Sequence, residues 1–186
     1  MIYFLRHAKT EYNYQNIISG QSDSPITCKP VLLSLKQQFE LIYSSPSKRC
    51  IETISCLENS TITPKYDARL LERYMGTFEG KSKENLKIDF PNLFKETNKK
   101  LNFNLFETPP KGESYDCFYE RVYSFYQDCI VPNNSKNILI CSHNQTLKML
   151  YFIYTKTPVT FDSWIRINVP NGKIIAIDEL SEISNK

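Results

Sequence analysis

Residues 137–142 read Asn-Ile-Leu-Ile-Cys-Ser and form the most apolar strand-like run of the sequence. An unbroken run of this kind is typical of a central strand in a parallel sheet, where both faces of the strand are covered. His143 follows the run directly. We therefore expect a buried strand with His143 in the loop at its carboxyl end.

Two other short apolar runs end on polar residues in the same way. Residues 1–5 (MIYFL) lead into Arg6-His7, and residues 41–43 (LIY) lead into Ser44-Ser45. In open α/β sheets, ligands bind beyond the carboxyl ends of the strands. Both histidines of the chain therefore lie where a ligand site is expected.

Helical patterns alternate with these strands. Leu32, Leu35 and Phe39 have helical spacing, and Ser45 with Pro46 predicts the start of a helix that runs to about Leu57. Later apolar stripes predict two further helices, and short runs predict a weak strand at 62–66 and late strands at 164–169 and 173–178 around a turn at 170–172. The stripes are Tyr115, Phe118, Val122, Phe125 and Cys129, and then Leu147, Leu150, Tyr151 and Tyr154.

This alternation predicts an α/β fold, a three-layer α/β/α sandwich with a mostly parallel central sheet. Neither a repeat nor a linker interrupts residues 1–186, so we expect a single domain. Residues 81–111 are rich in Lys and Asn and contain Pro91, Pro109 and Pro110. We expect this segment to be a small helical cap insertion of short helices and loop.

Composition excludes several classes of protein. The net charge of +3 is too small for a general nucleic-acid binder. No apolar run approaches the roughly 20 residues of a membrane span, and the charges at Arg6, His7 and Lys9 follow the first apolar run too early for a signal peptide. We expect a cytoplasmic protein with no membrane partner. The six cysteines form no CxxC pair and there are two histidines, so we expect reduced, mostly buried cysteines, no metal site and no cofactor.

The expected site combines imidazoles with guanidiniums. Arg6 precedes His7, and Arg49 lies in the first turn of the helix that follows residues 41–43. Forked guanidinium donors suit phosphate oxygens, and helix N-termini at the same edge favour an anion. Nearby cations disfavour protonation of an imidazole, which keeps a lone pair free for attack. Phosphoryl transfer mainly requires positioning and charge neutralisation, which these side chains supply without a metal.

Six segments, in order, give the sequence a specific resemblance. Together they resemble the blocks of the histidine phosphatase superfamily, in its phosphoglycerate-mutase-like branch of small broad-specificity phosphatases. The blocks span nearly the whole chain and contain four of its five glycines. They are Leu5-Arg6-His7-Ala8-Lys9-Thr10 with Asn13; 20–27 (GQSDSPIT); 44–49 with Glu52-Thr53; Leu71-Glu72 with Gly76, Glu79 and Gly80; 109–114 (PPKGES); and 140–143 (ICSH).

The resemblance implies a role for each matching residue. His7 would be the phosphorylated nucleophile, and Arg6, Arg49 and His143 would hold the phosphoryl group. Glu72 would protonate the leaving oxygen and then accept a proton from water, which requires a carboxyl group that burial keeps partly protonated. Asn13, Gly20 and Gln21 would also bind the phosphate. Glu79 and Glu113 are alternative acids, although Glu79 lies in a block with a structural role.

Three departures from the family pattern concern the site and its surroundings. Ala8 and Asn144 replace glycines, and the side chain of Asn144 is placed to contact or crowd the substrate. The stretch 28–41 is short, which predicts a first main helix about two turns shorter than usual.

The activity implied is hydrolysis of a small phosphorylated metabolite, through a phosphohistidine and without a metal. A phosphoglycerate-type phosphomutase is the alternative, and a non-catalytic phosphate-binding regulator or a protein phosphohistidine phosphatase is less favoured. The lysines of the cap either form a solvated face or attract a multiply anionic substrate. The substrate and the oligomeric state stay open. These lysines are Lys81, Lys83, Lys87, Lys95, Lys99, Lys100 and Lys111.

Overall fold

A five-stranded sheet forms the centre of the computed structural model, which describes residues 1–30, 39–57, 61–97 and 100–180. The strand order is β3-β2-β6-β1-β7. β6 pairs in parallel with both β1 and β2, and β7 runs antiparallel to β1. The run at 137–142 is thus the central strand, as predicted. The strands are β1 (Ile2–Arg6), β2 (Leu41–Ser44), β3 (Lys65–Tyr66), β6 (Ile138–Ser142) and β7 (Ile174–Ala176).

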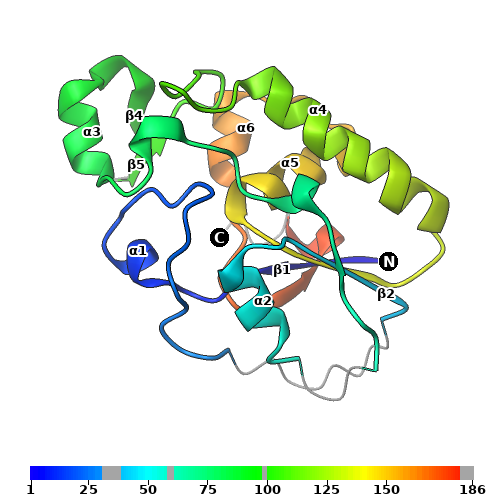
Figure 1. The fold of residues 1–186 in the computed structure, drawn as a ribbon. Coiled ribbons are helices and arrows are strands. Elements are labelled where there is room, and N and C mark those ends of the chain that lie inside the picture. Colours follow the sequence, from blue (N-terminus) through cyan, green and yellow to red (C-terminus); the bar gives the residue numbers. More distant parts are fainter. Residues whose placement is uncertain (31–38, 58–60, 98–99, 181–186) are drawn as a thin grey trace.

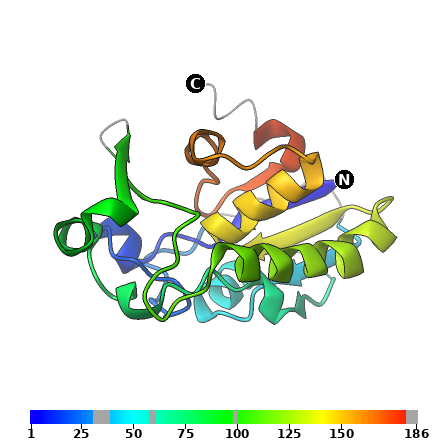
Figure 2. The same cartoon turned by 90° about the horizontal axis from the view of Figure 1, so that it is seen from above.

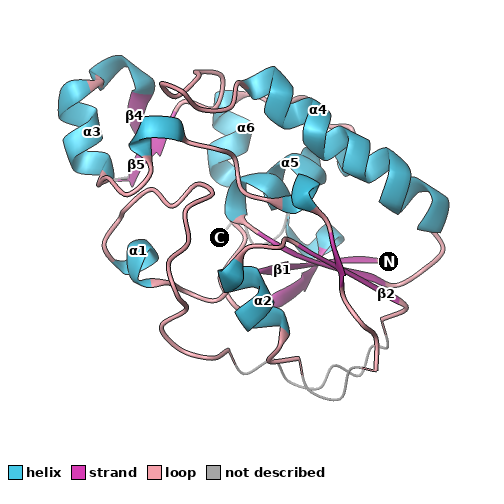
Figure 3. Cartoon of the chain, in the orientation of Figure 1, coloured by secondary structure: helices cyan, strands magenta, loops and turns pink. Residues whose placement is uncertain are grey.

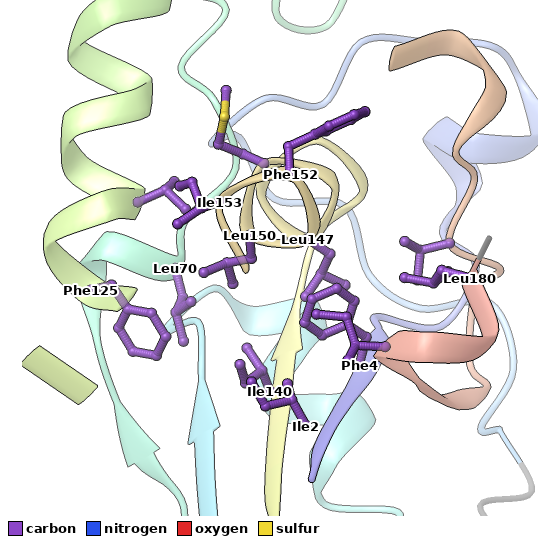
Figure 4. Close-up of a cluster of buried hydrophobic side chains, with 14 of the residues drawn as sticks. Ile2, Phe4, Leu70, Phe125, Ile140, Leu147, Leu150, Phe152, Ile153 and Leu180 are labelled. Atoms are coloured by element: carbon purple, nitrogen blue, oxygen red, sulfur yellow. The ribbon is translucent and has the colours of Figure 1, made fainter. Parts of the chain in front are cut away.

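Helices cover both faces of this sheet, which confirms the predicted three-layer α/β/α fold with a mostly parallel sheet (Figures 1 and 2). Because side chains alternate along a strand, Phe4 faces one layer and Leu5 the other. Phe4 packs with α4, α5 and α6, and Figure 4 shows part of this core. Leu5 packs with α2. The bounds are α2 (Lys48–Ile54), α4 (Tyr115–Phe125), α5 (Asn144–Thr155) and α6 (Phe161–Arg166).

The apolar stripe predicted at 115–129 is the buried face of α4. Phe118, Val122 and Phe125 are fully buried against the sheet. After Phe125 the chain continues as one wider turn at Tyr126–Ile130. A short helix, α1 (Glu11–Tyr14), follows β1 and was not predicted, because four residues carry no periodic signal.

The cap lies beyond the carboxyl ends of the parallel strands (Figure 3). Its Leu86 and Phe94 form a separate small core with Ile18, Met75 and Phe78 of the neighbouring segments. The cap consists of α3 (Lys83–Asp89) and a hairpin of β4 (Phe94–Thr97) and β5 (Lys100–Phe103). The expectation of helices and loop alone is therefore wrong. Phe94 and Phe103 face each other across the hairpin at 5.6 Å between ring centroids, and this aromatic packing stabilises strands in a polar segment.

Three other details differ from the sequence expectations, and a fourth expectation is not tested. Residues 164–169 do not form a strand, because Thr160 and Ser163 make a capping box that begins α6 before Trp164. α2 begins at Lys48 after the N-cap Ser47, since the Ser45 side chain is held by His143 instead. Only Cys50 and Cys141 of the six free cysteines are buried. The helix expected around Leu32 and Leu35 lies outside the described residues.

Candidate active site

His7 follows β1 directly and is 4% exposed. Its Nδ1 lies 2.7 Å from the carbonyl oxygen of Ala8, and a carbonyl only accepts, so Nδ1 carries the proton. The lone pair of the neutral ring is therefore on Nε2. Burial, followed by the charges of Arg6 and Arg49, holds the pKa of His7 well below its usual value. The ring is thus a neutral nucleophile with a defined tautomer.

Arg6 is a half-buried cation with unused hydrogen-bonding capacity. Its Nη1 donates to the carbonyl of Val169 at 3.1 Å, whereas Nε is buried without a partner among the described residues. Burial lowers the pKa of Arg6 to about 10, with attraction by Glu72 opposing and Arg49 adding to this effect. A buried donor without an acceptor is costly, and an anion in the site would satisfy it.

Arg49 and His143 are hydrogen-bonded to each other, and His143 lies next to His7. The Arg49 Nε donates to Nδ1 of His143 at 3.2 Å, and both side chains are buried. The neutral imidazole therefore carries its proton on Nε2, which lies 2.9 Å from the Ser45 hydroxyl. Burial, then the charges of Arg49 and His7, holds the pKa of His143 well below its usual value. The ring centroids of His7 and His143 are 5.3 Å apart.

Arg49 also holds the loop that was expected to bind phosphate. Its Nη2 donates to the carbonyl of Gly20 at 2.7 Å, and its Nη1 donates to the carbonyl of Ser22 and to Asp23. Gly20 has φ +53°, and a Cβ there would lie 2.0 Å from the Glu79 carboxylate, so only glycine fits. That carboxylate also accepts the backbone N–H of Gln21 at 2.8 Å. Glu79 therefore shapes the loop, as its block implied.

The carboxyl group of Glu72 is 9% exposed and lies at the N-terminus of α5. Oε1 accepts hydrogen bonds from the backbone N–H groups of Arg73 and Thr146 and from the Thr146 hydroxyl. Among the residues that the structure describes, Oε2 accepts only from the backbone N–H of Gln145. Oε2 therefore keeps free hydrogen-bonding capacity. Helix amides fix the position of this carboxyl group beside the cavity.

Polar residues from distant segments hold these groups in position. Thr53 accepts the backbone N–H of Ala8 at 2.8 Å and so ties α2 to the loop after β1. Asn171 donates to the carbonyl of His7 at 2.8 Å and lies 3.5 Å from Oδ1 of Asn13. Arg121 pairs with Glu113 and donates to the carbonyl of Glu72 at 3.4 Å. No role was predicted for Asn171 or Arg121, because they are isolated polar residues outside the six segments that resemble the family.

A cavity of about 180 Å³ joins these groups. Seven of the nine predicted site residues line it. His143 and Gln21 do not: His143 supports Arg49, and Gln21 donates from its side chain to the carbonyl of Glu72 at 3.1 Å. The seven are Arg6, His7, Asn13, Gly20, Arg49, Glu72 and Asn144.

Much of the remaining wall of the cavity comes from α5, α6 and the cap, and residues 17–19 and Met75 complete it. Lys148 and Trp164 lie on this side, together with Lys83. Lys148 was not among the residues predicted to form the site. Its position five residues after His143, on the helix that begins at the site, is the signal that was available. Other residues of this wall are Asn102, Phe103, Met75 and Gln145.

In the part of the chain that the structure describes, no group of three or more His, Cys, Asp or Glu side chains is close enough to share a metal ion. None of the helices in that part combines the length and the apolar character needed to cross a membrane.

Comparison with known proteins gives a consistent family. The sequence profile of the histidine phosphatase superfamily (branch 1) matches residues 2–181. "Putative phosphoserine phosphatase 2" of Hydrogenobacter thermophilus is 32% identical over 167 residues, which cover 83% of this chain and 78% of that protein. A 2,3-bisphosphoglycerate-dependent phosphoglycerate mutase of Cytophaga hutchinsonii is 27% identical over 164 residues, covering 81% and 75%.

A solved structure has the same fold. The protein of the open reading frame Rv3214 from Mycobacterium tuberculosis superposes with a TM-score of 0.76 at 18% identity, covering 93% of this chain and 88% of that one. The profile match and the 32% identical relative, together with the joining of His7, Arg6, Arg49 and Glu72 around one cavity, decide the assignment. The chain belongs to branch 1 of the histidine phosphatase superfamily and is an enzyme of the phosphatase class.

Proposed function

We propose that this enzyme hydrolyses a small phosphate monoester through a phosphohistidine on Nε2 of His7, without a metal ion. The observation that carries the proposal is the hydrogen bond from Nδ1 of His7 to the carbonyl of Ala8 at 2.7 Å. It leaves Nε2 as the unprotonated nitrogen of a ring whose pKa is lowered by burial and by two arginines. A positioned neutral imidazole is a competent nucleophile for phosphoryl transfer.

In the first step, Nε2 of His7 attacks phosphorus and the bond from phosphorus to the ester oxygen breaks. The leaving oxygen takes a proton from the carboxyl group of Glu72, for which Oε2 has free capacity. Arg6 neutralises charge on the equatorial oxygens, and its unpartnered Nε supports this role. Arg49, which is hydrogen-bonded to His143, acts together with Arg6 in neutralising this charge.

In the second step, Glu72 takes a proton from water as the water oxygen attacks phosphorus. The bond between phosphorus and Nε2 breaks, which releases inorganic phosphate and restores neutral His7. Gly20, Asn13 and Asn144 line the same cavity and are proposed to contact the phosphoryl group or its ester. Gln21 is proposed to act indirectly, through its hydrogen bond to the carbonyl of Glu72.

The nucleophile is tested with His7→Ala. The wild-type protein should form a phosphoenzyme that is stable in base and labile in acid, as expected for phosphorus on nitrogen. His7→Ala should lose both the phosphoenzyme and turnover while its circular dichroism spectrum is unchanged. Activity of His7→Ala near that of the wild type would refute the mechanism.

Metal independence is tested on the same protein. Turnover of p-nitrophenyl phosphate should persist in EDTA and should not need added Mg²⁺, because Arg6 and Arg49 supply positive charge at the cavity. Strict dependence on a divalent ion would contradict the proposal.

A phosphomutase is the second candidate function, since the Cytophaga relative is named as one and lysines line the cavity. Incubation with 3-phosphoglycerate, with and without 2,3-bisphosphoglycerate, separates the two. We expect release of inorganic phosphate to exceed formation of 2-phosphoglycerate. Isomer formation much faster than phosphate release would replace hydrolysis with mutase activity.

A further inference from the structure

Lys148 is a buried lysine that the proposed mechanism does not use. It lies on α5, is 6% exposed and lines the cavity. In the part of the chain that the structure describes, its Nζ makes no hydrogen bond and no ion pair. The Nζ lies over the indole of Trp164, 4.6 Å from the ring centroid. Burial of an ammonium group without an anion is unfavourable, so this arrangement calls for a ligand.

The charges around Lys148 increase this cost. Its pKa is lowered to about 7, first by burial, then by Arg6 on β1 and by Lys83 on α3, with the attraction of Glu72 opposing. Glu72 is already held by the amides of α5. Burial and the charge of Arg6 lower the pKa of Lys83 as well, and its Nζ likewise has no hydrogen-bond partner within the described ranges. Positive charge therefore exceeds negative charge on this side of the cavity.

Lys148 and His7 reach the cavity from different elements. His7 follows β1, whereas Lys148 lies on α5 with its Nζ over the ring of Trp164 of α6. Asn102 and Lys83 of the cap line the same cavity. The cavity thus carries two lysines, Lys83 and Lys148, in addition to Arg6 and Arg49.

We propose that Lys148 binds a second oxyanion of the substrate, so that the enzyme selects phosphate monoesters that also carry a carboxylate or a second phosphoryl group. The proposal rests on the proposed function, because it assumes that the first phosphoryl group lies at His7. An oxyanion on Nζ would form an ion pair in a site of low polarity, where such pairs are strong. A substrate with a neutral group there would leave the ammonium unpaired, and this difference gives selectivity.

Matched substrates test the proposal through ratios of kcat/KM. 3-Phosphoglycerate and glycerol 3-phosphate differ by a carboxylate in place of a hydroxymethyl group, and O-phosphoserine and O-phosphoethanolamine differ by one carboxylate. Fructose 1,6-bisphosphate and fructose 6-phosphate test a second phosphoryl group. In at least one pair, we expect the wild-type kcat/KM to be about tenfold or more higher for the substrate with the second anionic group. The pair that shows this preference also identifies the oxyanion. Equal kcat/KM within all three pairs would overturn the proposal.

Substitutions of Lys148 test whether its side chain causes the preference for the substrate with the second anionic group. Lys148→Met should lower the wild-type ratio about tenfold or more, chiefly through a higher KM for the anionic member. Lys148→Arg should retain most of the ratio because it keeps the charge. Lys81→Met removes an exposed lysine of the cap and should leave the ratio as it is. Equal losses for both members of a pair in Lys148→Met would show a structural role and refute oxyanion binding.

Binding without turnover separates this proposal from the proposed function. In His7→Asn protein, the affinity for 3-phosphoglycerate and glycerol 3-phosphate can be followed by the fluorescence of Trp164, the one tryptophan of the chain, because Nζ of Lys148 lies over its ring. We expect tighter binding of 3-phosphoglycerate, lost in the His7→Asn, Lys148→Met protein. If the wild type turns over no substrate but this difference in affinity stands, the proposed function fails and the oxyanion site holds. Equal affinities in His7→Asn protein would refute the oxyanion site.

Discussion

The Nε of Arg49 donates a hydrogen bond to Nδ1 of His143 over 3.2 Å, and this contact joins α2 to the end of β6. Every nitrogen of the Arg49 guanidinium has an acceptor, since Gly20, Ser22 and Asp23 take the rest. The two residues therefore form one buried unit that fixes the loop at 20–23. The roles expected for them in phosphate binding thus depend on each other.

Arg49→Lys should lower kcat/KM by about 10²-fold or more, because a lysine ammonium cannot reproduce the forked set of donors. The control is Lys48→Met in the same helix, where the side chain is 67% exposed, and it should retain wild-type turnover. The measurement is hydrolysis of p-nitrophenyl phosphate, with thermal unfolding of each variant beside it. Turnover of Arg49→Lys within about threefold of the wild type would contradict a role for the fork.

Formation of the phosphoenzyme should depend weakly on pH between 7.5 and 6. Burial and two arginines hold the pKa of His7 below 6.5, so the nucleophile stays neutral over this range. We expect a change of less than about twofold, whereas a histidine with an ordinary pKa would lose roughly fourfold. Rapid-quench measurement of phosphohistidine in single turnover decides between these values.

His7 and His143 should make the stability of the fold sensitive to acid. Their folded-state pKa values lie below the unfolded value near 6.5, so the unfolded chain binds more protons as the pH falls. The free energy of unfolding should therefore decrease below about pH 6.5. Urea unfolding at several pH values measures this, and the dependence should weaken in His7→Asn.

Glu72→Gln should slow hydrolysis of an alkyl phosphate by about 10²- to 10⁴-fold, because the leaving oxygen would lose its proton donor. The loss should be much smaller for p-nitrophenyl phosphate, whose leaving group needs little protonation. Glutamine keeps the size of the side chain at the N-terminus of α5. Equal losses with both esters would show that Glu72 acts by holding Thr146 and α5 rather than by proton transfer.

Lys148→Met should stabilise the protein most at low pH. With a folded-state pKa of about 7 against the ordinary lysine value of 10.5, Lys148 binds fewer protons in the folded than in the unfolded chain between these values. The cost of burying its charge is therefore largest below pH 7 and decreases as the pH rises. The difference in unfolding free energy between Lys148→Met and the wild type should shrink by about 2–3 kcal/mol from pH 6 to pH 9. A constant difference in chemical denaturation would contradict this.

Much of the scaffold followed from local patterns. The apolar run at 137–142, the runs at 1–5 and 41–43 and the stripe at 115–129 specified buried elements, because unbroken and periodic apolar residues have few other solutions. The late segment at 164–169 was read as a strand, since Trp164, Ile165 and Ile167 favour strands. Its helical start depends on the capping box of Thr160 and Ser163, a short polar signal that outweighed propensity.

For the site, the sequence alone determined the chemical types: the ends of parallel strands predicted that Arg6, His7, Arg49 and His143 would share one pocket, and the resemblance added Glu72. Of these five residues, all but His143 line the cavity. Only the tertiary structure decided how they are used. It gave His7 its tautomer, placed His143 behind Arg49 and brought Lys148 of α5 over Trp164 of α6. The physical reason is that chemical type is a property of each residue, whereas hydrogen-bond partners, burial and nearby charge depend on residues far apart in the chain.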